Sequence, residues 1–442
     1  MIKRFIRRVL GLSTESTVRM PRGKHGLARD SLSPAAAKVC AVLRDGGFQA
    51  YVVGGAVRDL LLGIEPKDFD IATDARPEQV KPLFRRAIII GRRFRLVHVL
   101  MGQDTVEVST FRAADPETAE KDEHGRVLRD NVFGSQEEDA RRRDFTVNAL
   151  YFDPASEEVV DFHGGLADLK KRVLRVIGDP ETRYREDPVR MLRAVRLAAK
   201  LGLTLDSATK EPIREMAPLM ERVPPARLFD EMLKLLLSGH ASACLRQLRE
   251  VGLSKGLLPL LDVILEQPLG ERFVTLALAQ TDERVLADRP VSPAFLFAAL
   301  LWHEVLAASK ARQARGERPI QALEFAMDEV LDTQCAKLAI TRKLTATMRE
   351  VWVMQPRFEN RSGNRAYRTL EAPRFRMAYD FLALRAASGE VPAELEAWWR
   401  AFQSADADSR TAMLLPDTGP KKRRRRRRRR GGGAPEQGPE PA

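Results

Sequence analysis

Residues 51–70, YVVGGAVRDLLLGIEPKDFD, constrain the fold of this chain more than any other stretch. The apolar start, ended by Gly54 and Gly55, predicts a short buried strand that meets a tight turn. Residues 56–62 then predict a helix that the next glycine stops. Because glycine lets a backbone approach an anion closely, free N–H groups at this helix start could bind a phosphate. Arg58 could add a charged donor there.

Two carboxylates, Asp68 and Asp70, follow this helix where a second strand is predicted over residues 69–72. Residues i and i+2 of a strand face the same side, so we expect the two carboxylates to point together. Paired carboxylates beside a phosphate site can hold the Mg²⁺ ions of phosphoryl or nucleotidyl transfer. The order strand, Gly-Gly, helix, Asp-x-Asp resembles the catalytic motif of the class II nucleotidyltransferases. That family includes tRNA CCA-adding enzymes and bacterial poly(A) polymerases.

The length of 442 residues allows two or three domains. No apolar run approaches the roughly 20 residues that a membrane-spanning helix needs. The three cysteines, Cys40, Cys244 and Cys335, are far apart, so neither a disulfide framework nor a zinc cluster is indicated. This usage favours a reducing compartment, and we expect a cytoplasmic protein.

The net charge of +13 is concentrated at the two ends of the chain, and residues 31–420 are almost neutral. Residues 416–442 contain eight consecutive arginines and are predicted to be disordered. Such a run attracts a phosphate backbone without reading sequence, so Arg423, Arg424 and Arg425 are candidate RNA contacts. The alternative is a solvated tail without a partner. A nuclear localisation signal has no other support in the sequence.

Residues 1–30 form a basic N-terminal arm. Its first residues, MIKRFIRRVLGL, place apolar side chains on one helical face with arginines opposite. This pattern could contact RNA or lie on an anionic membrane surface. It does not match a secretory signal, because its apolar run is interrupted.

A basic turn is expected after the β-branched run at residues 87–90, which predicts a strand. Arg92, Arg93 and Arg95 lie in this turn, and a further strand is predicted over residues 96–100. The segment resembles the signature that separates bacterial poly(A) polymerases from their CCA-adding relatives. It could contact the RNA end or the triphosphate, and the alternative is an ordinary charged hairpin turn.

Two residues are candidates for a third catalytic carboxylate. Glu107 lies in the alternating run at residues 105–111, which predicts a half-buried strand. Asp144 ends an Arg-Arg-Asp run that resembles the second motif of the family, placed before an Asn-Ala-Leu helix. The resemblance implies that Arg142, Arg143 and Asp144 contact the ribose and phosphates of the incoming nucleotide.

Strands are expected to give way to helices from residue 180 onwards. Asp187 and Arg190 are three apart on a predicted helix, so they should share a face. A carboxylate accepts hydrogen bonds and a guanidinium donates them, which suits the reading of a base edge. The pair resembles the family motif in which side chains choose the incoming base, and the alternative is a surface ion pair.

The C-terminal region over residues 357–387 resembles an arginine-rich region particular to bacterial poly(A) polymerases. Arginines interleaved with aromatic side chains suit single-stranded RNA. The candidate RNA contacts here are Arg365, Arg368, Arg374 and Arg376. Trp398 and Trp399 are predicted to pack beneath this region.

Together these features predict an α+β fold, with a small mixed-sheet nucleotidyltransferase head, an all-helical neck and body, and a disordered basic tail. The expected divisions are residues 1–30, 31–178, 179–240, 241–415 and 416–442. The candidate nucleotide-binding residues are Gly54, Gly55, Arg58, Arg142, Arg143, Asp144, Asp187 and Arg190. The candidate catalytic residues are Asp68, Asp70 and Asp144, and the candidate ligands of two Mg²⁺ ions are Asp68, Asp70 and Glu107.

The resemblance implies template-independent addition of AMP from ATP to RNA 3′ ends, with RNA-decay proteins as possible partners and no DNA. Two alternatives stay open. A CCA-adding enzyme shares the metal site and the base-reading motif. The second alternative is an RNA-binding adaptor without catalytic activity. Asp68 and Asp70 argue against it, because two like charges placed together are costly and such a protein does not need them.

Overall fold

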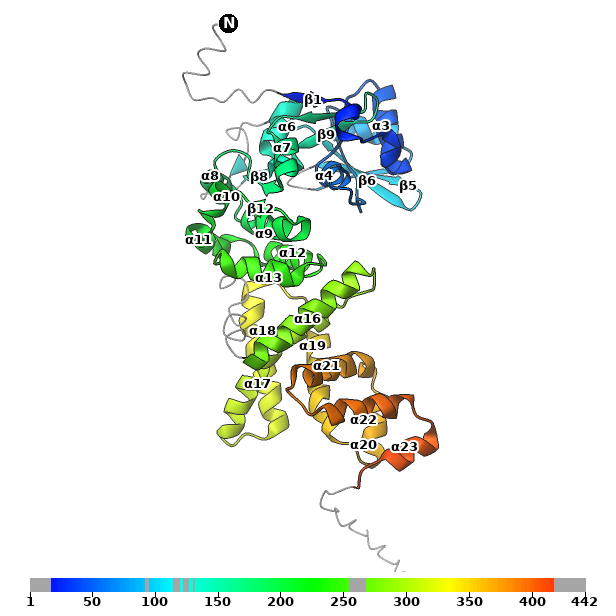
Figure 1. The fold of residues 1–442 in the computed structure, drawn as a ribbon, viewed down its shortest axis with the longest axis vertical. Helices are drawn as coiled ribbons and strands as arrows, with labels where there is room; N and C mark the ends of the chain where they lie inside the picture. Colours follow the sequence, from blue (N-terminus) through cyan, green and yellow to red (C-terminus); the bar gives the residue numbers. More distant parts are fainter. Residues whose placement is uncertain are drawn as a thin grey trace, which may run out of the picture.

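The computed structural model describes residues 17–91, 95–113, 120–121, 127–129, 132–253 and 268–416. Figure 1 shows an elongated molecule, with a sheet-containing head at one end and helices stacked below it. The predicted fold class, a mixed-sheet head followed by helices, is confirmed. The basic tail and the start of the N-terminal arm lie outside the described residues.

The head is built on an eight-stranded sheet of order β1-β10-β9-β2-β3-β6-β5-β4. Its strands are β1 (Val18–Met20), β2 (Ala50–Val53), β3 (Asp70–Thr73), β4 (Ala87–Ile90), β5 (Leu96–Met101), β6 (Asp104–Thr110), β9 (Leu150–Asp153) and β10 (Glu158–Asp161). Neighbouring strands are antiparallel except β3 and β6, which are parallel. This parallel pair places Asp70 in register with Glu107.

The helices of the head are α2 (Arg22–His25), α3 (Pro34–Asp45), α4 (Gly55–Leu61), α5 (Pro77–Val80), α6 (Gln136–Arg142) and α7 (Gly165–Lys171). The start of α3 is fixed by the hydroxyl of Ser33, which accepts a hydrogen bond of 3.2 Å from the N–H of Ala36. Val39 and Leu43 are buried on its inner face and join the core that includes Val52 of β2. Burial of this face holds α3 against the sheet.

Most predicted elements of the head are present, with two differences. The strand at residues 87–90 is observed with the predicted bounds, and the predicted helix at 56–62 begins one residue earlier. The Asn-Ala-Leu segment is not a helix, because Thr146–Asn148 form a 3₁₀ turn that leads directly into β9. Strands also continue beyond residue 180, since β11 (Val173–Leu174) pairs with β12 (Thr204–Leu205). A further pair is formed by β7 (Glu120–Lys121) and β8 (Val127–Arg129).

The neck consists of α8 (Pro180–Glu186), α9 (Val189–Leu201), α10 (Ser207–Lys210), α11 (Ile213–Met216), α12 (Pro225–Leu236) and α13 (Ala241–Glu250). The central helix, α9, contacts α8, α12 and α13. Its buried side chains recur every three to four residues, including Leu192, Val195 and Leu201. This stripe joins the neck to the same hydrophobic core as the head.

The body comprises α16 (Pro268–Leu286), α17 (Pro293–Ala314), α18 (Pro319–Lys337), α19 (Arg342–Met354), α20 (Gly363–Leu370), α21 (Phe375–Ser388), α22 (Ala393–Ser404) and α23 (Ala407–Met413). A second core around Phe375, Trp399 and Phe402 holds α20 to α23 together. By length and composition α17 could cross a membrane, the single described helix that could, although 56% of its most apolar window is buried in the body. That burial is the property of a core helix.

Candidate active site

The glycine turn lies between β2 and α4. Gly54 has a φ of 75°, a conformation that favours glycine, and its N–H donates to the carbonyl of Leu150 at 3.1 Å. A Cβ at Gly54 would stand 3.3 Å from Nη1 of Arg143, and one at Gly55 would stand 3.5 Å from Nη2 of Arg58. The Gly54 amide is therefore not one of the free N–H groups that the sequence predicts. The turn instead brings the backbone close to two arginines.

Asp70 begins β3, and Asp68 lies two residues before it, outside the strand. Asp70 remains accessible, yet protein atoms crowd its carboxylate. Burial of the carboxylate is the largest cause that raises the pKa of Asp70 to about 6, the charges of Glu107 and Asp68 act in the same direction, and the charge of Arg143 opposes them. Negative groups are thus gathered at this point of the sheet, which is what a cation site requires.

The carboxylates do not form a ready three-ligand cage. Within the described ranges, no group of three or more His, Cys, Asp or Glu side chains is placed to hold a metal ion. Glu107 is in register with Asp70, but its carboxylate lies 3.6 Å from the His98 ring. Asp68 and Asp70 as a pair, with Glu107 as a third ligand, therefore stay predictions.

Asp144 is buried at the junction of head and neck. Its carboxylate accepts hydrogen bonds from the N–H of Phe145 (2.9 Å) and the side chain of Asn148 (3.0 Å), and it lies 2.7 Å from Nη2 of Arg193. Burial would raise the pKa of Asp144, but the Arg193 charge and these hydrogen bonds outweigh it and lower the pKa. Of the two candidates for a third catalytic carboxylate, Glu107 is the one in register with Asp70.

Arg58 is held inside the head. Its guanidinium donates to Asp59 at 2.8 Å and to the side-chain carbonyl of Asn148 at 2.5 Å. Since Asn148 also donates to Asp144, a continuous polar chain runs from the glycine turn to the neck. A direct contact between Arg58 and a phosphate therefore stays a prediction, and the structure gives Arg58 a supporting position.

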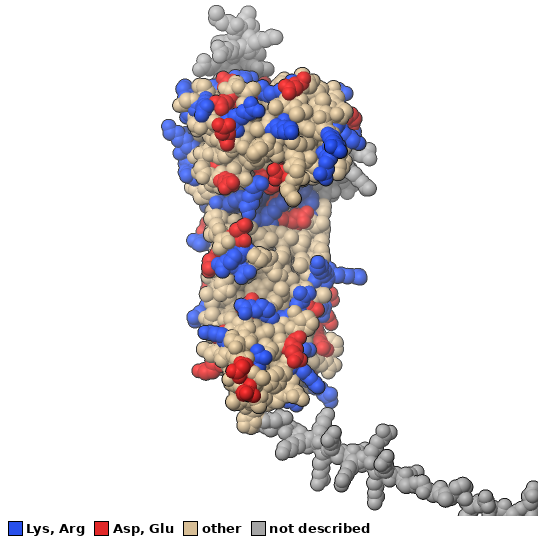
Figure 2. Space-filling view, turned by 90° about the vertical axis from the view of Figure 1, so that its right-hand side faces the viewer, with Lys and Arg blue, Asp and Glu red and all other residues tan. Residues whose placement is uncertain are grey.

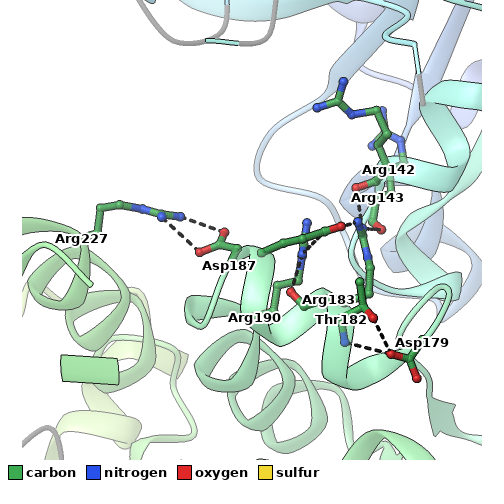
Figure 3. Close-up of polar contacts among 9 residues, drawn as sticks. Arg142, Arg143, Asp179, Thr182, Arg183, Asp187, Arg190 and Arg227 are labelled. Atoms are coloured by element: carbon green, nitrogen blue, oxygen red, sulfur yellow. Dashed lines mark hydrogen bonds and ion pairs between the residues drawn. The ribbon is translucent and has the colours of Figure 1, made fainter. Parts of the chain in front are cut away.

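Arginines from three helices gather where the neck meets the head (Figure 3). Arg142 and Arg143 lie at the end of α6, and Arg183 of α8 donates to their backbone carbonyls at 2.8 and 2.7 Å. Burial, with the charges of Arg112 and Arg183 next, lowers the pKa of Arg142 to about 10. The Arg142 guanidinium is therefore partly removed from water and lies close to other arginines.

Two carboxylates pair with this cluster, and Asp139 lies 3.1 Å from Nη2 of Arg143. Glu186 is the carboxylate that pairs with the neck arginines. It lies 2.7 Å from Nη1 of Arg183 and 3.0 Å from Nη1 of Arg190, so a single anion serves two cations. Figure 2 shows Lys and Arg side chains in the recess beneath the head. The arrangement suits an anion with several charges, such as a triphosphate.

Asp187 and Arg190 do not share a helix. Asp187 caps the end of α8 in an extended conformation, and Arg190 belongs to α9. The prediction that both lie on one helical face is wrong, because Pro188 forces the residue before it out of the helical region. Asp187 instead receives two hydrogen bonds from Arg227 of α12, at 3.1 and 3.0 Å (Figure 3).

Comparison with known proteins decides the family. Three family models match the chain: the poly A polymerase head domain over residues 50–175, the probable RNA and SrmB-binding site of polymerase A over 202–265, and the polymerase A arginine-rich C-terminus over 315–431. Poly(A) polymerase I of Escherichia coli O157:H7 is 47% identical over 409 residues, which are 89% of this chain and 88% of that protein. The chain belongs to the bacterial poly(A) polymerase I family.

Other members and their relatives agree with this placement. Poly(A) polymerase I of Haemophilus influenzae is 44% identical over 91% of this chain and 92% of that protein. A CCA-adding enzyme of Geobacillus thermodenitrificans is 41% identical over 47% of this chain and 50% of that enzyme. The predicted family is therefore confirmed, and as a member of the poly(A) polymerase family the chain is a polynucleotide adenylyltransferase.

Solved structures support the fold. The CCA-adding enzyme of Bacillus stearothermophilus in complex with CTP aligns with a TM-score of 0.57 and 28% identity, over 84% of this chain and 82% of that one. The Thermotoga maritima CCA-adding enzyme complexed with tRNA aligns with a TM-score of 0.59 over 91% and 92%, at 18% identity. The poly(A) polymerase family thus shares the nucleotidyltransferase head and helical arrangement with CCA-adding enzymes.

The candidate RNA contacts of this poly(A) polymerase family member are dispersed. Arg92, Arg93 and the tail arginines Arg423, Arg424 and Arg425 lie outside the described residues. Arg95 lies 2.5 Å from Glu78. In the body, Arg365 and Arg368 lie on α20, Arg374 pairs with Glu350, and Arg376 pairs with Asp380. Trp399 is buried and donates to the carbonyl of Phe358, and Trp398 stacks on Phe402, so the predicted packing of both tryptophans is confirmed.

Three arginines that sequence reasoning missed complete the site. They are Arg183, Arg193 and Arg227, which contact the Arg142–Arg143 backbone, Asp144 and Asp187 respectively. Arg183 and Arg193 flank the Glu-Asp-Pro-Val-Arg segment that was singled out, so their neighbourhood was a usable signal. Arg227 lies 40 residues from its partner in sequence, and no local pattern marks it.

Proposed function

We propose that this poly(A) polymerase family member extends RNA 3′ ends with AMP from ATP, without a template, and releases pyrophosphate. The observation that carries the proposal is the extent of the likeness. Poly(A) polymerase I relatives match 89–91% of the chain, whereas the CCA-adding relative of Geobacillus thermodenitrificans matches 47%. Two features of the site agree with this reaction, namely the register of Asp70 with Glu107 and the arginines at the junction of head and neck.

Asp68 and Asp70 are proposed to hold two Mg²⁺ ions, with Glu107 as a further ligand. Their donor set consists of carboxylate oxygens, which Mg²⁺ prefers. The pKa of Asp70 is raised by burial first and by the charges of Glu107 and Asp68 after it, and a bound cation would oppose both effects. Bound Mg²⁺ would lower the pKa of the RNA 3′-hydroxyl and would stabilise the departing pyrophosphate. The protein's own part is to hold the hydroxyl in line with the α-phosphate, which accounts for much of the acceleration.

The triphosphate of ATP is proposed to lie against the arginine cluster formed by Arg142, Arg143, Arg183 and Arg190. Fixed guanidinium groups that point at developing negative charge need no rearrangement during the reaction. Because Arg183 binds the backbone of Arg142 and Arg143, it acts as a positioning residue for both.

Base choice is proposed to depend on Asp187 and Arg190, with Arg227 as a support. Arg227 fixes the Asp187 carboxylate through two hydrogen bonds. Arg190 is oriented by Glu186 and by the carbonyl of Arg183. Polar groups oriented in this way discriminate strongly, because a wrong base leaves them unpaired.

The deciding experiment incubates the purified protein with a generic RNA oligonucleotide, Mg²⁺ and each nucleotide separately. ATP alone should give long tails, and CTP should be used poorly. Addition of CTP to a tRNA that lacks its 3′ end, halting after a few nucleotides, would overturn the proposal in favour of a CCA-adding enzyme. That alternative has the fold likeness to CCA-adding structures in its favour. No incorporation of any nucleotide would instead favour the silent RNA-binding adaptor.

The cellular setting is also a proposal. We expect a cytoplasmic enzyme whose tails promote RNA decay, and the model for a probable RNA and SrmB-binding site matches the neck over residues 202–265. A decay protein that binds this region should therefore be displaced by substitutions on α12 or α13. Contact of the N-terminal arm with a membrane rests on its sequence pattern alone.

A further inference from the structure

A pocket of about 320 Å³ lies in the body, and all of its lining residues belong to residues 349–374. It forms where α19 and the following 3₁₀ turn meet the loop between α20 and α21. Its floor is apolar, and its rim carries charge. The lining residues are Arg349, Glu350, Val353, Met354, Arg357, Ala372, Pro373 and Arg374.

Three arginines line this pocket, and two of them are paired with carboxylates. Arg374 is held by Glu350 at 2.7 Å, and Arg349 is paired with Asp328. Arg357 is exposed, and among the described residues it forms no ion pair or side-chain hydrogen bond. Arg357 is therefore available to an anion that binds beside the apolar floor.

The pocket places aliphatic side chains beside a guanidinium. A nucleobase is flat and largely apolar on its faces, so it can pack against Val353 and Pro373, while a guanidinium can meet the adjoining phosphate. A volume of this size accommodates one base. The family model for the arginine-rich C-terminus also covers this region.

We propose that this pocket binds one base of the RNA substrate, upstream of the 3′ end, with Arg357 on the neighbouring phosphate. The inference rests on the proposed function for its ligand, RNA. It shares Arg374 with the sequence prediction and adds Arg357 and Arg349, while Arg376 pairs with Asp380 and lies outside the pocket. A protein segment is the competing occupant.

The test measures equilibrium binding of a single-stranded RNA in which one abasic nucleotide is moved stepwise from the 3′ end. An abasic site removes a base and keeps the phosphate, so it separates base binding from charge. The full-length protein should lose affinity about tenfold at one abasic position, as burial of about 50 Å² of apolar base surface predicts. No ATP is present, so the measurement does not depend on catalysis.

Two variants and a control complete the design. Ala372→Leu fills the pocket without changing charge, and Arg357→Ala removes the phosphate contact from an exposed residue. Arg318→Ala removes the same charge at an exposed residue of the body outside the pocket. Ala372→Leu should bind intact RNA about tenfold more weakly and lose the abasic sensitivity. Arg357→Ala should weaken RNA binding and reduce the loss of affinity at the sensitive abasic position. Arg318→Ala should give the same abasic scan as the wild-type protein.

An abasic scan that is flat for the wild-type protein, or equally sensitive in Ala372→Leu, would overturn the RNA base as the occupant. Equal loss of RNA affinity in Arg318→Ala and Arg357→Ala would also overturn the proposal, because the loss would then depend only on the net charge of the protein. Failure of the proposed function has a separate readout, because the protein would then form no tails with ATP. That result does not depend on the abasic binding scan.

Discussion

Asp144 of the head and Arg193 of the neck form an ion pair of 2.7 Å across the junction between the two. The Asp144 side chain is 8% exposed, and that of Arg193 is 38% exposed. With Asn148 and Arg58 the pair completes a polar chain that ends beside the glycine turn. The position of the neck and the shape of the nucleotide site are therefore coupled through side chains that are mostly buried.

Replacement of Asp70 by alanine should abolish nucleotide addition and leave RNA binding intact. The substitution removes a proposed metal ligand but no surface that RNA must contact. Tail formation with ATP and equilibrium binding to a labelled RNA measure the two properties. Asp104→Ala, at the exposed start of β6, is a matched control. Activity of Asp70→Ala within about tenfold of wild type would contradict the two-metal assignment, since loss of an essential electrostatic group costs more than that.

Glu107→Gln and Asp144→Asn should affect different properties. Glu107→Gln should slow the reaction at every ATP concentration with little change in the free energy of unfolding, because Glu107 is in register with Asp70. Asp144→Asn should lower the free energy of unfolding by about 1–3 kcal/mol, because Arg193 loses its buried partner. Chemical denaturation and steady-state kinetics on both variants separate these effects, and the reverse pattern would assign Asp144 as the third carboxylate.

The contribution of Asp144 to stability should depend on pH. The folded state lowers the pKa of Asp144, so its stabilising effect is complete above the unfolded pKa of about 3.9 and is lost as pH falls through the folded value. The difference in unfolding free energy between wild type and Asp144→Asn should therefore shrink in acid. Denaturation curves from pH 7 down to pH 3 check this, and a difference that grows in acid would refute it.

Arg183→Ala should weaken the use of ATP. The two hydrogen bonds to the carbonyls of Arg142 and Arg143 are lost, and the remaining arginines are no longer held in place. We expect kcat/KM for ATP to fall at least about tenfold, with unchanged affinity for RNA. Arg185→Ala is a close control, because Arg185 is on the same helix and pairs with Glu181 at the surface. Equal kinetics of the two variants would remove Arg183 from the site.

Arg227→Ala should blur nucleotide choice in the same way as Arg190→Ala. Loss of Arg227 frees the Asp187 carboxylate from its two hydrogen bonds, so the group that would read the base is no longer fixed. The ratio of kcat/KM for ATP to that for CTP should fall in both variants more than the rate with ATP does. If Arg227→Ala lowers kcat/KM for all nucleotides by the same factor, Arg227 contributes to stability and not to selectivity.

Truncation after residue 418 should weaken RNA binding and flatten its dependence on salt. The truncation removes the run of eight arginines, and each lost phosphate contact on a single strand should change the slope of log K against log salt by about 0.7. Binding at a series of salt concentrations measures the slope. An unchanged slope would mean that the arginines do not contact RNA in the assay.

Local patterns in the sequence predicted the elements well. The strand at residues 87–90 contains three consecutive β-branched isoleucines, and the helix predicted at 56–62 is followed by a glycine, so each was identified with little error. The strand predicted after the first aspartate of the Asp-x-Asp pair is also observed, shifted by one residue to 70–73. These features depend on a few neighbouring residues, which is why a single sequence contains them.

Long-range partners could not be read in the same way. The register of β3 with β6 sets Asp70 beside Glu107, and Arg227 reaches Asp187 across a gap of 40 residues. Both depend on how elements pack, which sequence patterns do not specify. The error at Asp187 had a local cause that could have been recognised, because the proline after it ends the helix.

The contacts of Arg183 go to two backbone carbonyls, and a carbonyl is present whatever side chain a position carries. Substitutions at positions 142 and 143 can therefore change what the enzyme binds without cutting the tie between head and neck. Evolution could therefore change nucleotide preference through side chains at these positions while the contact between head and neck is kept. Changes in specificity need not destabilise the fold at this point of the molecule.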